Sequence, residues 1–175
     1  MKPFVRTLEQ SVAAFMRKDY ATALAGFTKL ADRGLADAQY KLGVMYEHGE
    51  GVPKDDAEAV KWSRMAADQG YALAQYNLGA KYDDGTGVPK DDAEAAMWYH
   101  KAADQGDADA QNNLGVMYQN GEGVPENTVE AYKWFSLAAA RGNKDAETNR
   151  HILGAAMTRE QIADAQRLLD QWKPG

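Results

Sequence analysis

Few side chains of this 175-residue sequence have the type and spacing that catalysis requires. The chain has no cysteine, which excludes disulfide bonds, thiolate metal sites and a cysteine nucleophile. A serine nucleophile of the hydrolase type sits in a glycine-flanked turn between a strand and a helix. The serines are Ser11, Ser63 and Ser136, and none has that setting. We therefore expect no catalytic residue.

Metal ligands are equally sparse. His48, His100 and His151 belong to no recognised zinc pattern, and we interpret them as surface or partly buried side chains. The pairs Asp55–Asp56 and Asp91–Asp92 would suit calcium, but the spacing of an EF-hand loop is absent. Each pair precedes a helical segment, where an aspartate caps free backbone N–H groups. The sequence therefore predicts no metal site and no cofactor.

A glycine-rich segment also raises the question of phosphate binding. It reads GEGVP at 49–53, GTGVP at 85–89 and GEGVP at 121–125. A nucleotide-binding loop ends in Lys-Ser or Lys-Thr and follows a strand, whereas this segment has neither feature. We interpret it as a structural connector.

The elements that position all these residues come from a repeat of 36 residues. AQYKLGVMY (38–46) recurs as AQYNLGAKY (74–82) and AQNNLGVMY (110–118). Each copy continues with the glycine-rich segment, a tryptophan, a pair of alanines and a closing glycine. The tryptophans are Trp62, Trp98 and Trp134, and the closing glycines are Gly70, Gly106 and Gly142. Such a period indicates a repeat solenoid, and the tryptophans fit its core better than a ligand-stacking platform.

Each repeat predicts two helices. The first covers about 38–46 and the second about 55–69 in the first copy. Asp55 and Glu58 form a capping pair that starts the second helix. Gly70 ends it, because glycine adopts the left-handed conformation without strain.

A glycine lies inside each first helix, at Gly43, Gly79 and Gly115. Glycine at such a position costs about 1 kcal/mol relative to alanine. Its occurrence in all three copies predicts a close approach between helices.

The ends of the chain are atypical, as the ends of solenoids are. Two helices are expected at 4–17 and 20–33, another at 144–156, and a last one from a Thr158–Gln161 capping box to about Trp172. The prediction is an all-α, right-handed superhelix of about five antiparallel helix pairs. We expect a single domain over 1–175, divided into a leading repeat (1–35), three repeats (36–71, 72–107 and 108–143) and capping helices (144–175).

The pattern A-x-x-x-L-G-x-x-Y, the G-x-G-V-P loop, the tryptophan-bearing second helix and the closing glycine resemble the Sel1-like repeat family. That family is related to the tetratricopeptide repeats, which the leading segment FMRKDYATAL resembles more closely. The resemblance implies a non-catalytic scaffold or adaptor that binds partners along its concave surface. Some cysteine-rich relatives are described as penicillin-binding or β-lactamase-like, but they carry a disulfide in each repeat and this chain has no cysteine.

In solenoids of this class the first helix of each pair lines the concave face, so its variable positions are the candidate contacts with a partner. The repeats agree at packing positions and differ at these ones. Tyrosine offers rigid contact area, and asparagine can bond a peptide backbone as donor and acceptor. The predicted partner-binding residues are Tyr40, Lys41, Val44, Glu47, Tyr76, Asn77, Ala80, Asp83, Asn112, Asn113, Val116 and Gln119.

Charge narrows the class of partner. The net charge is −6, and residues 1–35 carry six Lys or Arg and three Asp or Glu. An acidic chain without a basic stripe argues against nucleic acid, and no apolar run is long enough to enter a membrane. We expect a protein or peptide partner and a monomeric chain. The N-terminal residues lack an uninterrupted apolar stretch, which favours the cytoplasm over the periplasm or secretion.

Two other functions are compatible with the same residues. The chain would serve equally as an accessory or regulatory subunit of a bound enzyme. A penicillin-hydrolysing activity would need a paired nucleophile or a metal, and the sequence offers neither.

Overall fold

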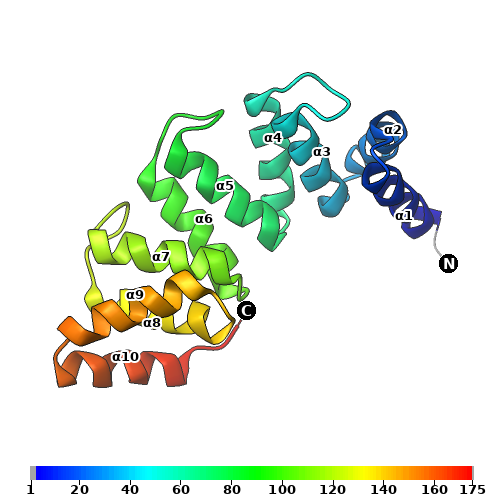
Figure 1. Ribbon diagram of the computed structural model, residues 1–175. Coiled ribbons are helices and arrows are strands. Elements are labelled where there is room, and N and C mark those ends of the chain that lie inside the picture. Colours follow the sequence, from blue (N-terminus) through cyan, green and yellow to red (C-terminus); the bar gives the residue numbers. More distant parts are fainter. Residues whose placement is uncertain (1–2, 175) are drawn as a thin grey trace.

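The computed structural model describes residues 3–174, which form ten helices and no strand. Residues 1–2 and 175, at the ends of the predicted domain, lie outside the described residues. Figure 1 shows the helix pairs following an arc from the N-terminal to the C-terminal end. The helices are α1 (Pro3–Met16), α2 (Tyr20–Ala31), α3 (Ala36–His48), α4 (Asp56–Asp68), α5 (Ala72–Asp84), α6 (Asp92–Asp104), α7 (Ala108–Asn120), α8 (Thr128–Ala140), α9 (Lys144–Ala156) and α10 (Arg159–Gln171).

From α1 to α9, each helix packs on the one that follows it in the chain. Small alanines bring the helices together: Ala59, Ala66 and Ala74 are completely buried. Larger side chains fill the spaces between pairs, and Trp98 and Trp134 are only 2% and 1% exposed. The predicted all-α solenoid is confirmed, and these two tryptophans belong to its core. No helix in the described chain is long and apolar enough to span a bilayer.

The second helices begin at the predicted caps. The Asp55 carboxylate accepts hydrogen bonds from the backbone N–H groups of Ala57 and Glu58, both at 3.0 Å. Asp91 and Asn127 do the same in the next two repeats. The expected reciprocal role of Glu58 is not seen, because its carboxylate pairs with Lys61 at 3.0 Å. An i,i+3 ion pair on a helix surface competes with that second bond of the box.

The capping box at the last helix is complete. The Thr158 hydroxyl accepts from the Gln161 backbone N–H at 3.2 Å, and the Gln161 side chain accepts from the Thr158 N–H at 2.9 Å.

The glycine-rich loops, 49–55, 85–91 and 121–127, connect the two helices of a repeat and also touch the preceding repeat. Gly87 has a φ of +74° and passes directly over the first turn of α4, where a Cβ atom would overlap the Asp56 carbonyl group. Gly123 lies over Asp92 of α6 in the same way. Only glycine allows both this backbone conformation and this approach. The loops are therefore structural connectors, as predicted, and they link neighbouring repeats.

The glycines inside the first helices also mark close contacts. A Cβ at Gly79 would lie 2.7 Å from the Tyr99 ring, and one at Gly115 would lie 2.6 Å from the Phe135 ring. A Cβ at Gly43 would meet the Ser63 hydroxyl at 2.8 Å. Each glycine thus lets the second helix of its own repeat approach the first.

Buried glutamines connect consecutive repeats. The Gln75 side chain donates to the Ala67 carbonyl at 3.1 Å and accepts from Gln105 at 2.7 Å. The same arrangement is found one repeat earlier. In the third repeat the position of Gln105 is occupied by Arg141, and the Oε1 atom of the buried Gln111 has no hydrogen-bond partner.

The last helix departs from the pattern. Its N-terminus follows α9 after the two residues 157–158, instead of after a seven-residue loop. Helix α10 packs on α8 rather than on α9. Ala165 is buried there, and Leu169 and Trp172 join the hydrophobic cluster around Trp134. The chain end thus covers α8 and leaves one face of α9 open.

Candidate partner-binding surface

The twelve predicted contact residues lie on α3, α5 and α7, and we call them the first-helix surface. Eleven of them are half-buried and Gln119 is exposed. The members are Tyr40, Lys41, Val44 and Glu47 on α3, Tyr76, Asn77, Ala80 and Asp83 on α5, and Asn112, Asn113, Val116 and Gln119 on α7. The structure shows that many of them bond to neighbouring helices.

Tyr40 packs against Tyr71, the residue that precedes α5. Its ring centroid lies 5.4 Å from that of Tyr71, whose hydroxyl donates to the Asp37 carboxylate at 3.4 Å. Burial raises the pKa of Tyr40, and the negative charges of Glu47 and Asp107 raise it further. The phenol therefore stays neutral and keeps a hydrogen to donate.

Tyr76 forms a similar pair inside the second repeat. Its ring lies 5.8 Å from that of Tyr99. Burial raises the pKa of both phenols, and a hydrogen bond with Asn113 of the next repeat acts in the opposite direction. Tyr99 also donates to the Asp83 carboxylate at 3.5 Å. Three of the predicted contact residues, at 76, 83 and 113, thus meet at one place.

A set of four polar residues joins the first and second repeats, and we call it the polar junction: Glu47, Ser63, Asn77 and Lys81. The Lys81 ammonium, with a side chain only 4% exposed, lies 2.9 Å from Oε1 of Glu47. Asn77 donates to Oε2 of Glu47 at 3.3 Å and accepts from the Ser63 hydroxyl at 3.3 Å. Glu47 is therefore held from two sides.

The electrostatics of Glu47 follow from these contacts. Partial burial alone would raise the pKa of its carboxyl group, but the hydrogen bond and positive charge of Lys81 and the hydrogen bond from Asn77 outweigh burial and lower it. Glu47 is thus a fixed carboxylate at neutral pH, with a side chain that is 27% exposed.

The remaining residues divide into two groups. Asn112 accepts from Asn149 of α9 at 3.1 Å, and Ala80 and Val116 pack on hydrophobic clusters. In the described chain, Lys41 lies 5.8 Å from the Tyr40 ring and makes no hydrogen bond or ion pair, and Gln119 makes no hydrogen bond. Val44 is half-buried and belongs to none of the hydrophobic clusters of the described residues. The second group is the one that can meet a partner without breaking a contact between repeats.

Sequence reasoning missed two members of the polar junction, although the repeat itself identifies them. Lys81 stands at the position of Met45 and Met117, and Ser63 stands at the position of Tyr99 and Phe135. A charged and a small polar residue thus replace two large apolar ones at buried sites. Comparing the copies position by position would have found both.

The family model described as Sel1 repeat matches residues 36–71, 72–107 and 108–143. This chain belongs to the Sel1 repeat family. Proteins built from Sel1 repeats generally mediate protein–protein interactions, and the scaffold is generally non-catalytic.

Three solved structures resemble this Sel1 repeat protein. A Sel1 repeat protein from Oxalobacter formigenes is 30% identical, with a TM-score of 0.82 over 93% of this chain and 74% of its own. A protective antigen present in uropathogenic Escherichia coli strains is 31% identical, with a TM-score of 0.65 over 97% of this chain and 47% of its own. The cysteine rich protein B of Helicobacter pylori is 26% identical, with a TM-score of 0.58 over 73% and 92%.

Two curated relatives match a short segment of this chain. They are the DAP3-binding cell death enhancer 1 proteins of Rattus norvegicus and Mus musculus, which are 50% and 48% identical over 42 residues. That segment covers 24% of this chain and only 8% of each relative.

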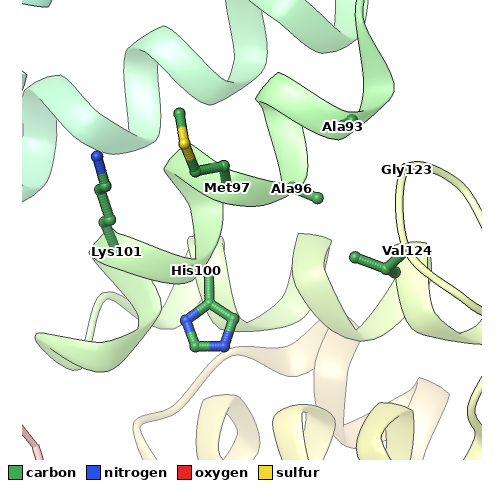
Figure 2. Close-up of a pocket in the computed structure, with 7 residues that line it drawn as sticks. All are labelled: Ala93, Ala96, Met97, His100, Lys101, Gly123 and Val124. Atoms are coloured by element: carbon green, nitrogen blue, oxygen red, sulfur yellow. The ribbon is translucent and has the colours of Figure 1, made fainter.

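The second Sel1 repeat also carries a pocket on its second helix (Figure 2), with a volume of about 350 Å³. Its lining residues are Ala93, Ala96, Met97, His100, Lys101, Gly123 and Val124. Figure 2 shows Val124 pointing from its loop toward α6. The pocket exists because Ala96 is small, whereas the equivalent residues are Val60 and Tyr132.

One polar pair at this Sel1 repeat pocket was not anticipated. Nδ1 of His100 lies 2.9 Å from the Asp104 carboxylate, and its ring lies 5.3 Å from that of Trp134. All three histidines, at 48, 100 and 151, are exposed. Within residues 3–174, no group of three or more His, Asp or Glu is placed to hold a metal ion. A His–Asp pair without a nucleophile or third ligand supplies no recognised catalytic arrangement.

Proposed function

We propose that this protein is a non-catalytic scaffold that holds a protein or peptide along the first-helix surface. The observation that carries the proposal is the contrast between the copies. They share Leu42, Leu78 and Leu114 in the core, whereas the surface triplets Tyr40/Tyr76/Asn112 and Glu47/Asp83/Gln119 differ. A constant frame with a variable face is what partner-specific recognition on repeats requires.

The contacts that hold these side chains strengthen the proposal. Glu47 is fixed by Lys81 and Asn77, and Tyr40 is fixed by Tyr71. Side chains that are already immobile lose little conformational entropy when a partner binds, so each bond to them contributes more to affinity. The first-helix surface thus offers a neutral donor at Tyr40 and a carboxylate acceptor at Glu47.

The test uses residues that make no bond between repeats. A first-helix variant would carry Lys41→Ala, Val44→Ser and Gln119→Ala. A matched control on the second helices would carry Lys61→Ala, Met97→Ser and Lys101→Ala. The first-helix variant removes one cation and the control removes two. All six side chains are exposed or half-buried, so both variants should keep the helical circular dichroism spectrum of the wild type.

The measurement is quantitative capture of cross-linked partners from cells that express the protein. Retention by the wild type and the control, with loss in the first-helix variant, would support the proposal. If the first-helix variant retains the partner and the control loses it, the binding site lies on the second helices, at or near the pocket on α6. Equal retention by all three chains would remove both surfaces from consideration.

A further inference from the structure

The last first-type helix, α9, breaks the repeat at two core positions. Leu42, Leu78 and Leu114 are each at most 1% exposed, and the equivalent residue of α9 is Arg150. The next position is glycine in α3, α5 and α7, and in α9 it is His151. Two basic residues thus replace the leucine and glycine on which a second helix normally packs.

The path of the chain explains how α9 tolerates them. In the three repeats the second helix covers the face that carries the leucine and glycine. After α9 the two-residue connection carries α10 onto α8 instead. Arg150 is therefore half-buried and not enclosed in a core, where an unpaired guanidinium would be strongly destabilising.

A pocket of about 330 Å³ occupies this position between α8, α9 and α10. Its lining residues are Tyr132, Arg150, His151, Gly154, Ala155 and Ile162. The Tyr132 ring lies against Gly154, where a Cβ atom would be only 2.9 Å from the ring. Tyr132 and Ile162 thus provide apolar walls, and the two basic side chains provide the polar part.

Arg150 has no carboxylate partner, which sets it apart from comparable cations. Lys81 and Lys133 are paired with Glu47 and Glu130, and Arg64 bonds the Tyr82 hydroxyl. Among Lys and Arg side chains of residues 7–174 that are half-buried or buried, Arg150 is the one with neither a hydrogen bond, an ion pair nor an aromatic ring as partner. A guanidinium in this state can form two parallel hydrogen bonds to one carboxylate.

We propose that this pocket binds a carboxylate attached to an apolar group, with Arg150 as the bidentate donor and His151 as a second donor. The apolar group lies between Tyr132 and Ile162. A volume of about 330 Å³ is at the lower end of ligand pockets, so the apolar group is about the size of one aromatic side chain. A small organic acid and the C-terminal residue of a partner chain share this chemistry.

The apolar walls decide between a carboxylate of this kind and a simple inorganic anion. Inorganic phosphate is polar on every side and would gain nothing from Tyr132 or Ile162. An apolar acid would bury surface against both residues in addition to its bond with Arg150. The site is separate from the first-helix surface, so its outcome does not depend on the proposed scaffold function.

The test is titration of the full chain with N-acetyl-L-phenylalanine and, in parallel, with the corresponding primary amide. Chemical shifts of the α9 backbone amides report binding. The acid should bind saturably at millimolar concentration or better, and the amide at least about tenfold more weakly, a difference of about 1.4 kcal/mol. Arg150→Leu should weaken acid binding by at least the same factor.

Control variants test whether a loss of binding comes from misfolding or from the change in net charge. Leucine occupies the equivalent position of α3, α5 and α7, so Arg150→Leu should fold, and Arg150→Gln is a second variant that keeps a polar side chain. Lys144→Leu removes the same charge from the exposed start of α9 and should bind the acid as the wild type does.

Two further arms identify the source of the carboxylate. A hexapeptide with a free C-terminal phenylalanine that binds more tightly than the capped amino acid would identify a chain terminus. Tighter binding of the capped amino acid would identify a small organic acid. The proposal would be overturned if the acid and the amide bind equally, or if Arg150→Leu binds the acid as the wild type does. It would also be overturned if binding of the acid does not saturate up to about 10 mM, the dissociation constant of the weakest specific ligands.

Discussion

The junction between the first and second repeats and the junction between the second and third are built at equivalent positions from opposite kinds of side chain. In the first, Ser63 and Lys81 occupy the two large buried positions. In the second, Tyr99 and Met117 occupy them and belong to one hydrophobic cluster. Lys81 compensates its burial through the Glu47 carboxylate.

The comparison shows what a repeat can vary without losing its fold. A buried ion pair contributes little net stability, because desolvation of both charges offsets their attraction. The two repeats must nevertheless align so that the two charged side chains meet, because burying either charge without its partner is strongly unfavourable. We call the contact of Tyr99 and Met117 between the second and third repeats the apolar junction. We infer that the polar junction fixes the geometry between the first two repeats, whereas the apolar junction supplies more of the stability.

The largest expected loss of stability comes from filling the close contact between Gly79 and the Tyr99 ring of the apolar junction. Gly79→Leu places a branched side chain where even a Cβ would lie 2.7 Å from the Tyr99 ring. We expect the free energy of unfolding to fall by about 3 kcal/mol through overpacking. Gly43→Leu is the matched change, and a Cβ there would meet the movable Ser63 hydroxyl at 2.8 Å and the Ala59 carbonyl oxygen at 3.1 Å. We expect it to cost less, because Ser63 is much smaller than Tyr99. Urea denaturation followed by circular dichroism measures both variants, and equal losses would contradict the difference between the junctions.

The next effect comes from breaking the polar junction on one side. Glu47→Ala removes the partner of the buried Lys81 ammonium. We expect a loss of about 2 kcal/mol, less than for a completely buried pair because the Glu47 side chain is 27% exposed. Glu58→Ala is the matched control, since its partner Lys61 is 59% exposed and the pair should contribute less than about 1 kcal/mol. A smaller loss for Glu47→Ala than for the control would refute the importance of the buried pair.

Converting the polar junction into an apolar one should stabilise the chain. The triple variant Glu47→Gln, Ser63→Phe and Lys81→Met introduces the residue types of the third repeat, which are Gln119, Phe135 and Met117. It removes both charges of the pair, and replacing a buried ion pair by well-packed neutral side chains is neutral or stabilising, so we expect a gain of about 1 kcal/mol. Lys81→Met alone should be less stable than the triple variant, because it leaves the Glu47 carboxylate without its cation. Equal stability of the two variants in urea denaturation would contradict this coupling between the positions.

The smallest effect is a pH dependence confined to the polar junction. The pKa of Glu47 is lower in the folded chain than its ordinary value of 4.5. Its contribution to stability is therefore complete above pH 4.5 and is lost as the pH falls through the folded value. The wild type should lose more stability between about pH 5 and 3 than the triple variant, which lacks both the Glu47 carboxylate and the Lys81 ammonium. Identical acid profiles would mean that other carboxylates dominate this range.

The comparison also explains why the fold was more predictable than the site. The segment expected at 144–156 is the helix Lys144–Ala156, and the second helix expected at 55–69 is Asp56–Asp68. Local signals determine such bounds, because a cap or a closing glycine acts within a few residues. The first helix was expected at 38–46, but α3 runs from Ala36 to His48. Its N-terminus was missed because the preceding residue, Leu35, makes no side-chain cap.

The surface could be predicted only in part, because its contacts join residues about 30 positions apart. Asn77 and Glu47 were predicted to contact a partner, and the structure shows that they bond to each other. Hydrophobic periodicity shows which face of a helix is buried, but it does not show which polar groups meet across repeats. The unusual residue types Lys81 and Ser63 at buried positions were the available signal, and they are visible in the aligned copies.

Packing of each helix on its successor also determines how the chain can form. Contacts between neighbouring helices are close in sequence, and chains dominated by such contacts fold quickly. A repeat can therefore assemble on the part of the chain already synthesised, without waiting for distant segments. Helix α10 is the exception, because it returns to α8 across α9 and brings Trp172 into the cluster around Trp134. The hydrophobic cluster around Trp134 is thus completed only after α10 has been synthesised.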